Sequence, residues 1–371
     1  MNKALQLLEL GQSLWFDSIR RGMLHNGEMA GMIARGEIRG VTSNPTIFMQ
    51  AITKSTDYDD SLQALGKMAL KPEDVFFKLA IEDIQAAADL FAPLYQQTQG
   101  GDGYVSLEVS PNLAYDSEAT LVQAKEIWRR VNRPNLMIKI PATSAGLPAI
   151  TAAIAAGINV NATLIFSIDR YREVMEAYLK GLEQRLNAGL QLKDIASVAS
   201  FFVSRMDSKV DLQLQKIIDA GGANAAIAEQ LLGKAAIANA RLAYATFKEV
   251  AASTRFMALQ AQGAQVQRPL WASTSTKNPA YRDVRYVEEL IGKDTVNTVP
   301  PQTLAAFLDH GEVRPSLEED LEGARKVFEQ LEVIGISYRK VTGELEVEGV
   351  NAFADAFTTL LNAIEERRKV F

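Results

Sequence analysis

The sequence contains no cysteine and only two histidines, His25 and His310. Without cysteine the chain can form no disulfide, and it offers no thiolate to a metal or a substrate. The two histidines lack HxxxH-type spacing, which argues against a zinc site, and no GxSxG segment accompanies either of them. We therefore expect no metal site, and the chemistry is left to carboxylates, lysine, hydroxyls and amides.

Long apolar runs and basic runs are also missing. No stretch is apolar enough over its length to span a bilayer, and residues 1–10 carry acidic and polar residues where a signal peptide would have its apolar core. The net charge of −6 is modest and spread along the chain, so nucleic acid is not expected as a partner. We expect a cytoplasmic protein without membrane contact, as a monomer or a homodimer.

The most informative stretch that is present is the apolar run 136–140, which is bounded by Pro134 and Pro141 and contains Lys139. Such a run is typical of a strand buried on both faces. Pro141 cannot donate to a sheet, so the strand should end there and leave Lys139 near its carboxyl end. Burial disfavours the charged form of a lysine and leaves its amine able to form a Schiff base with a carbonyl. The alternative is a lysine that reaches solvent from an edge strand or pairs with a carboxylate for structural reasons.

Short apolar runs alternate with helical patterns along the chain, which predicts βαβ units and a parallel sheet. Eight such units, with no GxGxxG or GxxxxGK[ST] turn, favour an α/β fold of the closed (β/α)8 TIM-barrel type over an open sheet. The predicted strands are residues 13–18, 40–43, 104–109, 136–140, 158–166, 197–203, 269–272 and 295–299.

Helical patterns fill the intervals between the predicted strands. An alanine-rich stretch over 224–262 predicts a long helical insertion before the seventh strand. Residues 316–371 predict two extra C-terminal helices packed on the barrel and joined at residues 341–343. No Pro/Gly/Ser-rich linker divides the chain, so residues 1–371 are expected to form a single domain. The other predicted helices are 23–35, 72–95, 116–131, 147–156 and 167–188.

Polar side chains collect at the carboxyl ends of the predicted strands, where the active sites of such barrels lie. Each has a structural alternative: Asp17 could cap the next helix, and Glu108 could be an ion-pair partner. These alternatives do not explain why all the polar residues fall at the same end. They are Asp17, Thr42, Asn44, Glu108, Lys139, Asn161, Thr163, Ser200, Arg205 and residues 273–277.

Together these residues suit the cleavage of a carbon–carbon bond beside a carbonyl. Lys139 would be the Schiff-base nucleophile, and the carboxylates of Asp17 and Glu108 would take and return protons. The amides of Asn44 and Asn161 would hold substrate hydroxyls. Arg205 and Lys277, with the nearby hydroxyls, would make an anion site suited to the phosphate of a phosphosugar.

The chain resembles the transaldolases over nearly all of the predicted barrel, and its length resembles the longer bacterial members. The TSNP motif (42–45) and the NxTLxFS pattern over 161–167 are specific to that family. The segments WASTSTKNPAY (271–281) and VNTVPPQT (296–303) are similar to those of the longer members. The other matching segments are WFD (15–17), GVTSNPT (40–46), SLEV (106–109), IKIPAT (138–143), NVNATL (159–164) and SFFVSR (200–205).

The resemblance implies a role for each matching position. Lys139 corresponds to the Schiff-base lysine, and Asp17 to the acid/base that removes the proton of the C4 hydroxyl. Glu108 and Thr163 correspond to the pair that orients the catalytic water. The remaining positions correspond to substrate-binding residues: Asn44 and Asn161 around the dihydroxyacetone unit, Ser200 in the pocket, Arg205 on one phosphate position, and Lys277 on the second with Ser275 nearby.

The implied reaction moves a dihydroxyacetone unit from fructose 6-phosphate to erythrose 4-phosphate, which gives sedoheptulose 7-phosphate and glyceraldehyde 3-phosphate reversibly. No cofactor is implied. One alternative is an aldolase that releases free dihydroxyacetone; members with that activity have tyrosine where this chain has Phe202, and a phenyl ring cannot hold water. Another is a catalytically silent barrel that binds phosphosugars or a partner protein, which a missing lysine or carboxylate would indicate.

Overall fold

The chain folds into a parallel barrel covered by helices. The computed structural model describes residues 2–66 and 68–370, of which Val370 by its backbone alone; Met1 and Phe371, the ends of the predicted domain, lie outside the described residues. The seven strands form one sheet in the order β1-β7-β6-β5-β4-β3-β2, and each neighbouring pair is parallel. The strands are β1 Gln12–Phe16, β2 Val105–Glu108, β3 Leu136–Pro141, β4 Val160–Ile165, β5 Ser197–Phe202, β6 Arg268–Ala272 and β7 Thr295–Val299.

A single residue closes the ring between β1 and β2. Val41 forms parallel bridges to both Phe16 and Val105, and its backbone carbonyl accepts from the amide of Ser106 at 3.0 Å. The predicted α/β TIM-barrel fold is therefore confirmed, but the predicted strand over 40–43 is reduced to this one position. Gly40 gives a reason, because glycine weakens a strand, and a Cβ there would lie 2.6 Å from the Trp15 ring.

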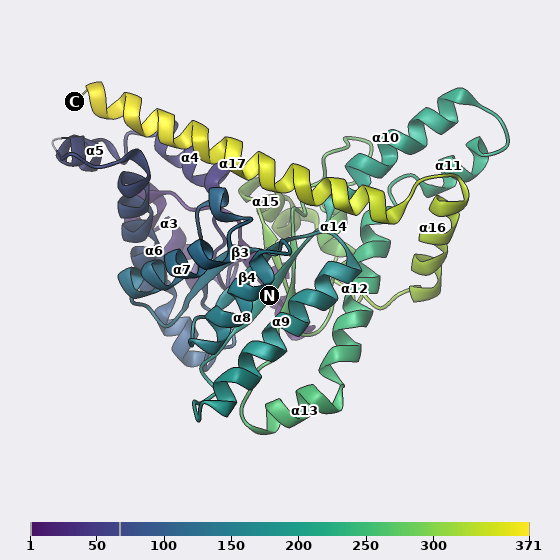
Figure 1. Cartoon of the computed structure of the whole chain (residues 1–371). Coiled ribbons are helices and arrows are strands. Elements are labelled where there is room, and N and C mark those ends of the chain that lie inside the picture. The colour runs from purple at the N-terminus through teal and green to yellow at the C-terminus, as the bar shows by residue number, and fades with distance from the viewer. Residues whose placement is uncertain (1, 67, 371) are drawn as a thin grey trace.

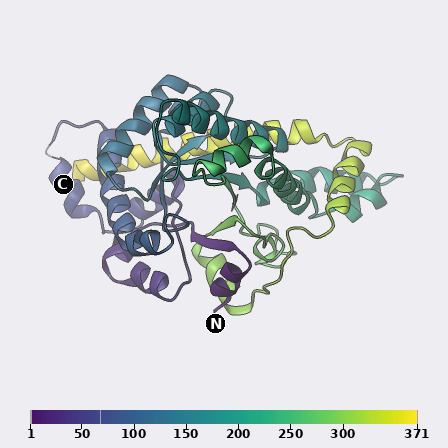
Figure 2. The ribbon, with the colours of Figure 1, turned by 90° about the horizontal axis from the view of Figure 1, so that it is seen from below.

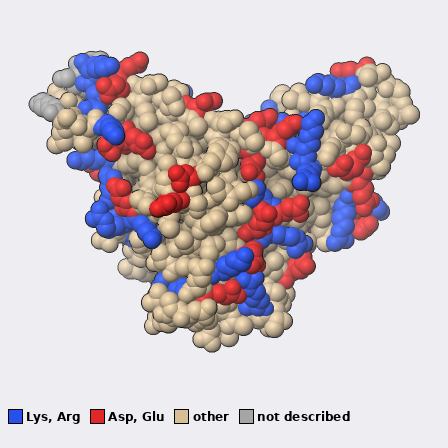
Figure 3. Space-filling view, viewed as in Figure 1, with Lys and Arg blue, Asp and Glu red and all other residues tan. Residues whose placement is uncertain are grey.

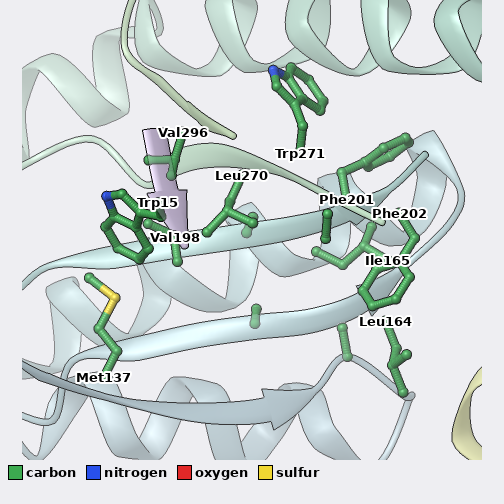
Figure 4. Packing of buried hydrophobic residues seen from close by; sticks show 14 of the residues in the cluster. Trp15, Met137, Leu164, Ile165, Val198, Phe201, Phe202, Leu270, Trp271 and Val296 are labelled. Carbon is green, nitrogen blue, oxygen red and sulfur yellow. The ribbon is translucent and has the colours of Figure 1, made fainter. Parts of the chain in front are cut away.

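Side chains inside the barrel are layered. At the amino end of the strands, the carboxylate of Asp102 accepts hydrogen bonds from Ser13 at 2.7 Å and from Arg39 at 2.6 Å. An apolar layer follows, and barrels of this kind are filled in such layers. Its members Trp15, Met137, Val198, Leu270 and Val296 are buried and converge in Figure 4. The polar residues of the next layer therefore lie at the carboxyl ends of the strands.

Helices surround the barrel (Figure 1). Those that lie between successive strands alternate with them as the sequence predicted, and their apolar faces pack on the sheet. The helices are α1 Lys3–Glu9, α2 Arg21–His25, α3 Glu28–Ala34, α4 Pro45–Thr53, α5 Asp59–Gly66, α6 Pro72–Gln97, η1 Pro111–Leu113, α7 Ser117–Val131, α8 Gly146–Ala155, α9 Ile168–Asn187, α10 Ser204–Ala220, α11 Ala225–Leu231, α12 Ala235–Ala251, α13 Thr254–Ala261, α14 Arg285–Glu288, α15 Pro301–His310, α16 Leu321–Val333 and α17 Tyr338–Val370.

Two predicted helical stretches are divided in the structure. The alanine-rich stretch over 224–262 forms α11, α12 and α13, because Gly233 adopts a φ of 67° after α11 and the Ser253 side chain caps α13. These helices, with α10, form the predicted insertion between β5 and β6. The stretch over 23–35 is divided into α2 and α3 at Gly27, whose φ is 86°.

The last two helices differ from the prediction in where they join. The predicted junction at 341–343 lies inside α17, and the chain turns instead between α16 and α17, where Gly335 has a φ of 89°. Helix α17 runs across the face where the strands end, from the side of α10 to the side of α5 (Figures 1 and 2). Its Phe357 packs edge-on against Phe76 of α6 at 5.3 Å. The single domain over residues 1–371 stays a prediction.

The surface carries both signs of charge. Lysine and arginine side chains are interspersed with aspartate and glutamate over the face shown in Figure 3. None of the described helices combines the length and the apolar character that crossing a membrane requires.

Candidate active site

A cavity of about 880 Å³ lies at the carboxyl ends of the strands. Most of the predicted site residues line it, although they come from segments far apart in the sequence. Glu108, Asn161 and Thr163 do not line it; in the strand register Glu108 and Asn161 are opposite Lys139, and Thr163 is opposite Pro141. The predicted residues in the wall are Asp17, Asn44, Lys139, Ser200, Phe202, Arg205, Ser275 and Lys277.

The side chain of Lys139 is 5% exposed and extends from β3 into this cavity. Its Nζ donates to the backbone carbonyl of Ser43 at 3.2 Å and lies 3.5 Å from Oε2 of Glu108. Glu108 is directly opposite Lys139 in the register of β2 and β3. The amine therefore lies inside the barrel, and Lys139 is not a lysine that reaches solvent from an edge strand.

Glu108 is a buried carboxyl group with an altered proton affinity. Burial raises its pKa to about 7, and the nearby Asp17 adds to the rise, while Lys139 opposes it. Neither carboxylate oxygen has a hydrogen-bond partner within the described residues, and the same is true of the hydroxyl of Thr163 on β4. Buried polar atoms without partners are uncommon, and water is their usual partner.

Asp17 follows β1 and faces the cavity. Its Oδ1 accepts from the Thr42 hydroxyl at 2.6 Å, and that hydroxyl also lies 2.6 Å from the hydroxyl of Thr298. Burial raises the pKa of Asp17, whereas Lys139 and Thr42 counteract the rise. The helix that follows is preceded by Arg20 as its cap, so Asp17 does not serve the structural role considered as its alternative.

The TSNP motif fixes the segment beside β1. Asn44 caps α4 by accepting from the amide of Ile47 at 3.0 Å, and Pro45 occupies the first helical turn. Because the cap uses the side-chain oxygen of Asn44, the side-chain amide nitrogen is left to donate into the cavity that the residue lines. The Ser43 hydroxyl donates to the carbonyl of Ser106 at 2.7 Å, which holds in place the Ser43 carbonyl that accepts from Lys139.

Asn161 links three strands through its amide. Its Nδ2 donates to Ser106 of β2 at 3.1 Å, and its Oδ1 accepts from Ser200 of β5 at 2.7 Å. The residue is opposite Lys139 in the register of β3 and β4. The amide is thereby held at a fixed orientation next to the lysine.

Two cations, Arg205 and Lys277, line the cavity. Arg205 makes no hydrogen bond or ion pair within the described part of the chain, and its guanidinium lies 5.5 Å from the Phe202 ring centroid. Lys277 donates to Ser275 at 2.7 Å. Burial lowers the pKa of Lys277, and the positive charge of Arg205 lowers it further. The two charges therefore act on the same volume, where an anion would relieve their repulsion.

Among the wall residues that lie outside the predicted set, one is next to Lys139. Phe353 of α17 lines the cavity, and its ring centroid is 5.5 Å from Nζ of Lys139. The sequence shows that α17 has an apolar face with helical spacing, but that pattern does not identify what the face packs against. Thr298 and Ser43 also contribute to the site through contacts that the strand pattern alone did not indicate, whereas Ser273 lines the cavity and belongs to the polar set that the sequence predicted.

Metal-binding clusters are not found among residues 2–66 and 68–370: no group of three or more His, Asp or Glu side chains there is placed to hold an ion.

The fold and the cavity are those of an α/β-barrel enzyme with a buried lysine at the carboxyl ends of its strands. Residues 14–364 match the family described as Transaldolase/Fructose-6-phosphate aldolase. A protein of Saccharopolyspora erythraea named Transaldolase is 48% identical over 362 residues, which cover 97% of this chain and 96% of that protein. A Transaldolase of Trichodesmium erythraeum is 46% identical over 374 residues, covering 99% and 98%, and one of Mycolicibacterium smegmatis is 48% identical over 356 residues, covering 96% and 94%.

The chain therefore belongs to the transaldolase/fructose-6-phosphate aldolase family, and the predicted resemblance is confirmed. Similarity over nearly the full length to proteins named Transaldolase supports a transaldolase enzyme.

Proposed function

We propose that the chain transfers a dihydroxyacetone unit between sugar phosphates through a Schiff base on Lys139. The donors are fructose 6-phosphate or sedoheptulose 7-phosphate, and the acceptors are erythrose 4-phosphate or glyceraldehyde 3-phosphate. We propose that this reaction serves the non-oxidative pentose phosphate pathway and that the protein acts in the cytoplasm. The observation that carries the proposal is the buried amine of Lys139 in the cavity wall, 3.5 Å from Glu108.

Schiff-base formation requires a neutral amine and the removal of one water. Lys139 attacks the C2 carbonyl of the ketose, and the resulting carbinolamine loses its hydroxyl as water to give an iminium ion. Glu108 is near enough to exchange protons with the amine, and a pKa of about 7 suits it to do so in both directions near neutral pH. The Thr163 hydroxyl, which has no partner among the described residues, is the second group for holding that water.

Cleavage then needs a base at the C4 hydroxyl. Asp17 takes that proton, the bond between C3 and C4 breaks, and the electron pair moves into the iminium to give an enamine. The aldose phosphate leaves, and a second aldehyde is attacked by C3, after which Asp17 returns its proton to the new hydroxyl. The hydrogen bond from Thr42 at 2.6 Å orients the Asp17 carboxylate for this step.

The sugar hydroxyls and the phosphate are bound around the reacting carbon. The amides of Asn44 and Asn161 and the Ser200 hydroxyl hold the three-carbon unit. Arg205 and Lys277 bind the phosphate, because their like charges share a volume in which a phosphate relieves the repulsion.

Borohydride reduction tests the covalent step. We expect incubation with fructose 6-phosphate and borohydride to add a reduced sugar fragment to the peptide that contains Lys139, as measured by mass spectrometry. Lys139→Ala should abolish this adduct. Lys180→Met is the matched control, since Lys180 is an exposed lysine that pairs with Glu176 at 3.4 Å, and this change should leave the Lys139 adduct intact. Full trapping in Lys139→Ala would refute the assignment.

The competing function is an aldolase that releases free dihydroxyacetone. Phe202 lines the cavity and is 6% exposed, and its ring offers no hydroxyl to water. We therefore expect slow conversion of fructose 6-phosphate alone and fast conversion when erythrose 4-phosphate is added. Equal rates with and without the acceptor would favour the aldolase.

A further inference from the structure

Two aromatic rings from different elements form an apolar wall beside Lys139. Phe353 of α17 is 5% exposed, and its ring centroid lies 5.5 Å from Nζ. The ring of Phe202 on β5 lies 6.5 Å from that of Phe353 at an angle of 62°. Both residues line the cavity. The amine therefore has polar groups of the barrel on one side and this aromatic wall on another.

Contacts on both sides of Phe353 hold α17 in place. Toward the amino end of the helix, Glu348 pairs with Lys209 of α10 at 2.6 Å. Toward its carboxyl end, Arg367 donates to the backbone carbonyl of Ser55 at 3.0 Å. Between these anchors the helix backbone approaches β4 closely. A Cβ at Gly349 would lie 3.2 Å from atoms of Leu164 and Phe166. The position of the Phe353 ring is thus fixed by the docking of the whole helix.

We infer that Phe353 keeps bulk water from the covalent intermediate on Lys139 and thereby favours transfer of the three-carbon unit over its release. This inference rests on the proposed Schiff-base function. After cleavage, the unit is held as an enamine on Nζ of Lys139. Transfer forms a carbon–carbon bond to an aldehyde. Release instead needs a proton at the enamine carbon and one water at the iminium carbon, after which the C–N bond breaks and dihydroxyacetone leaves the free amine.

Release of dihydroxyacetone from the enamine consumes a water molecule, whereas transfer to an aldehyde does not. The Phe353 ring lies where it can limit the access of water to Lys139. Phenyl rings offer no strong hydrogen-bond acceptor or donor, so water beside them loses interactions that it has in bulk. The polar atoms near Lys139 that lack partners among the described residues, on Glu108 and Thr163, can hold the water that the reaction uses. Phe353 restricts the approach of further water during the lifetime of the enamine, while an acceptor aldehyde diffuses in.

The experiment compares release with transfer in the full chain. Dihydroxyacetone release is measured with fructose 6-phosphate alone, and transfer is measured after erythrose 4-phosphate is added. We expect Phe353→Ala to raise the ratio of release to transfer about tenfold. Phe353→Leu keeps the apolar volume without the aromatic face, so its ratio should stay close to that of the unchanged protein. If the ring instead acted by a cation–π interaction with the iminium ion, Phe353→Leu would raise the ratio of release to transfer as much as Phe353→Ala does.

The matched control is Leu360→Ala. Leu360 is fully buried on α17 but does not line the cavity, so this change loosens the same helix without altering the wall. An unchanged ratio in Phe353→Ala, or an equal rise in Leu360→Ala or Phe353→Leu, would overturn the inference. Borohydride trapping separates the two proposals: absence of a Lys139 adduct in the unchanged protein contradicts the proposed function itself. If the unchanged protein forms the Lys139 adduct but Phe353→Ala does not, the result contradicts only the proposed role of the Phe353 ring.

Discussion

The amine of Lys139 and the carboxylate of Glu108 face each other across the register of β3 and β2, with Nζ 3.5 Å from Oε2. Both side chains are at most 5% exposed. An isolated charge in such a place is costly, and the positive charge of Lys139 counteracts the rise that burial causes in the pKa of Glu108. The pair therefore links the chemistry of the site to the pH dependence of the protein.

Stability should depend on pH through Glu108. Its pKa rises from 4.5 to about 7 on folding, so the folded chain keeps a proton that the unfolded chain releases between those values. This contribution is fully present below about pH 4.5 and is lost as the pH rises through about 7. Relative to Glu108→Gln, the free energy of unfolding should fall by about 3 kcal/mol over that interval, as measured by urea denaturation at several pH values. Parallel pH profiles for the two proteins would contradict this role of burial.

Asp17→Asn should stop the reaction after the Schiff base has formed. Loss of the base that removes the C4 hydroxyl proton should lower kcat by about 10²- to 10⁴-fold. The borohydride adduct on Lys139 should then have the mass of the whole sugar phosphate and not of the three-carbon unit. Asp283→Asn is the control, because Asp283 also lines the cavity but pairs with His310 at the surface, and it should keep its activity. A three-carbon adduct in Asp17→Asn would show that another group acts as the base.

Arg205→Ala should weaken the binding of phosphorylated substrates. We expect the KM for fructose 6-phosphate to rise about 10- to 100-fold, the loss that follows from removing a hydrogen bond to a charged group. Slow conversion of unphosphorylated fructose should be unaffected. Arg172→Ala, at an exposed arginine paired with Glu249, serves as the control for the loss of one positive charge. An equal loss with both substrates would assign Arg205 a structural role.

Phe357→Ala should destabilise the fold through the docking of α17. Phe357 is 1% exposed and packs on Phe76, and removal of a buried phenylalanine costs about 3–5 kcal/mol. Val347→Ala on the same helix changes a side chain that is 51% exposed and should shift stability by no more than about 0.5 kcal/mol. Thermal denaturation of both variants measures the difference, and equal melting temperatures would mean that α17 contributes little to stability.

The strand that carries Lys139 could be predicted from the sequence because its signals are local. An apolar run, a single lysine and a proline boundary define β3, and the structure places it as predicted, with Pro141 included. The short segment around Val41 could not be predicted correctly, because its strand character depends on two neighbours distant in the sequence. The pattern there shows only that the residues are apolar or small.

The site could be predicted where its residues follow strands, and not where they come from elsewhere. Asp17 lies near the end of a predicted strand, Asn44 and Arg205 follow predicted strands, and all three line the cavity; their chemical roles stay predictions. Phe353 belongs to a helix beyond the barrel, and a helical repeat indicates a buried face without indicating its partner. The junction before α17 was misplaced for a related reason: a glycine inside a helix and a glycine at a turn look alike in sequence, and only the φ of 89° at Gly335 separates them.

The order of elements along the chain has a consequence for how the cavity is assembled. All seven strands precede α17, so the parallel sheet supplies Lys139, whereas the Phe353 ring beside the amine comes from a segment outside that sheet. Substitutions on α17 can therefore change one wall of the cavity and leave the strand that holds Lys139 unchanged.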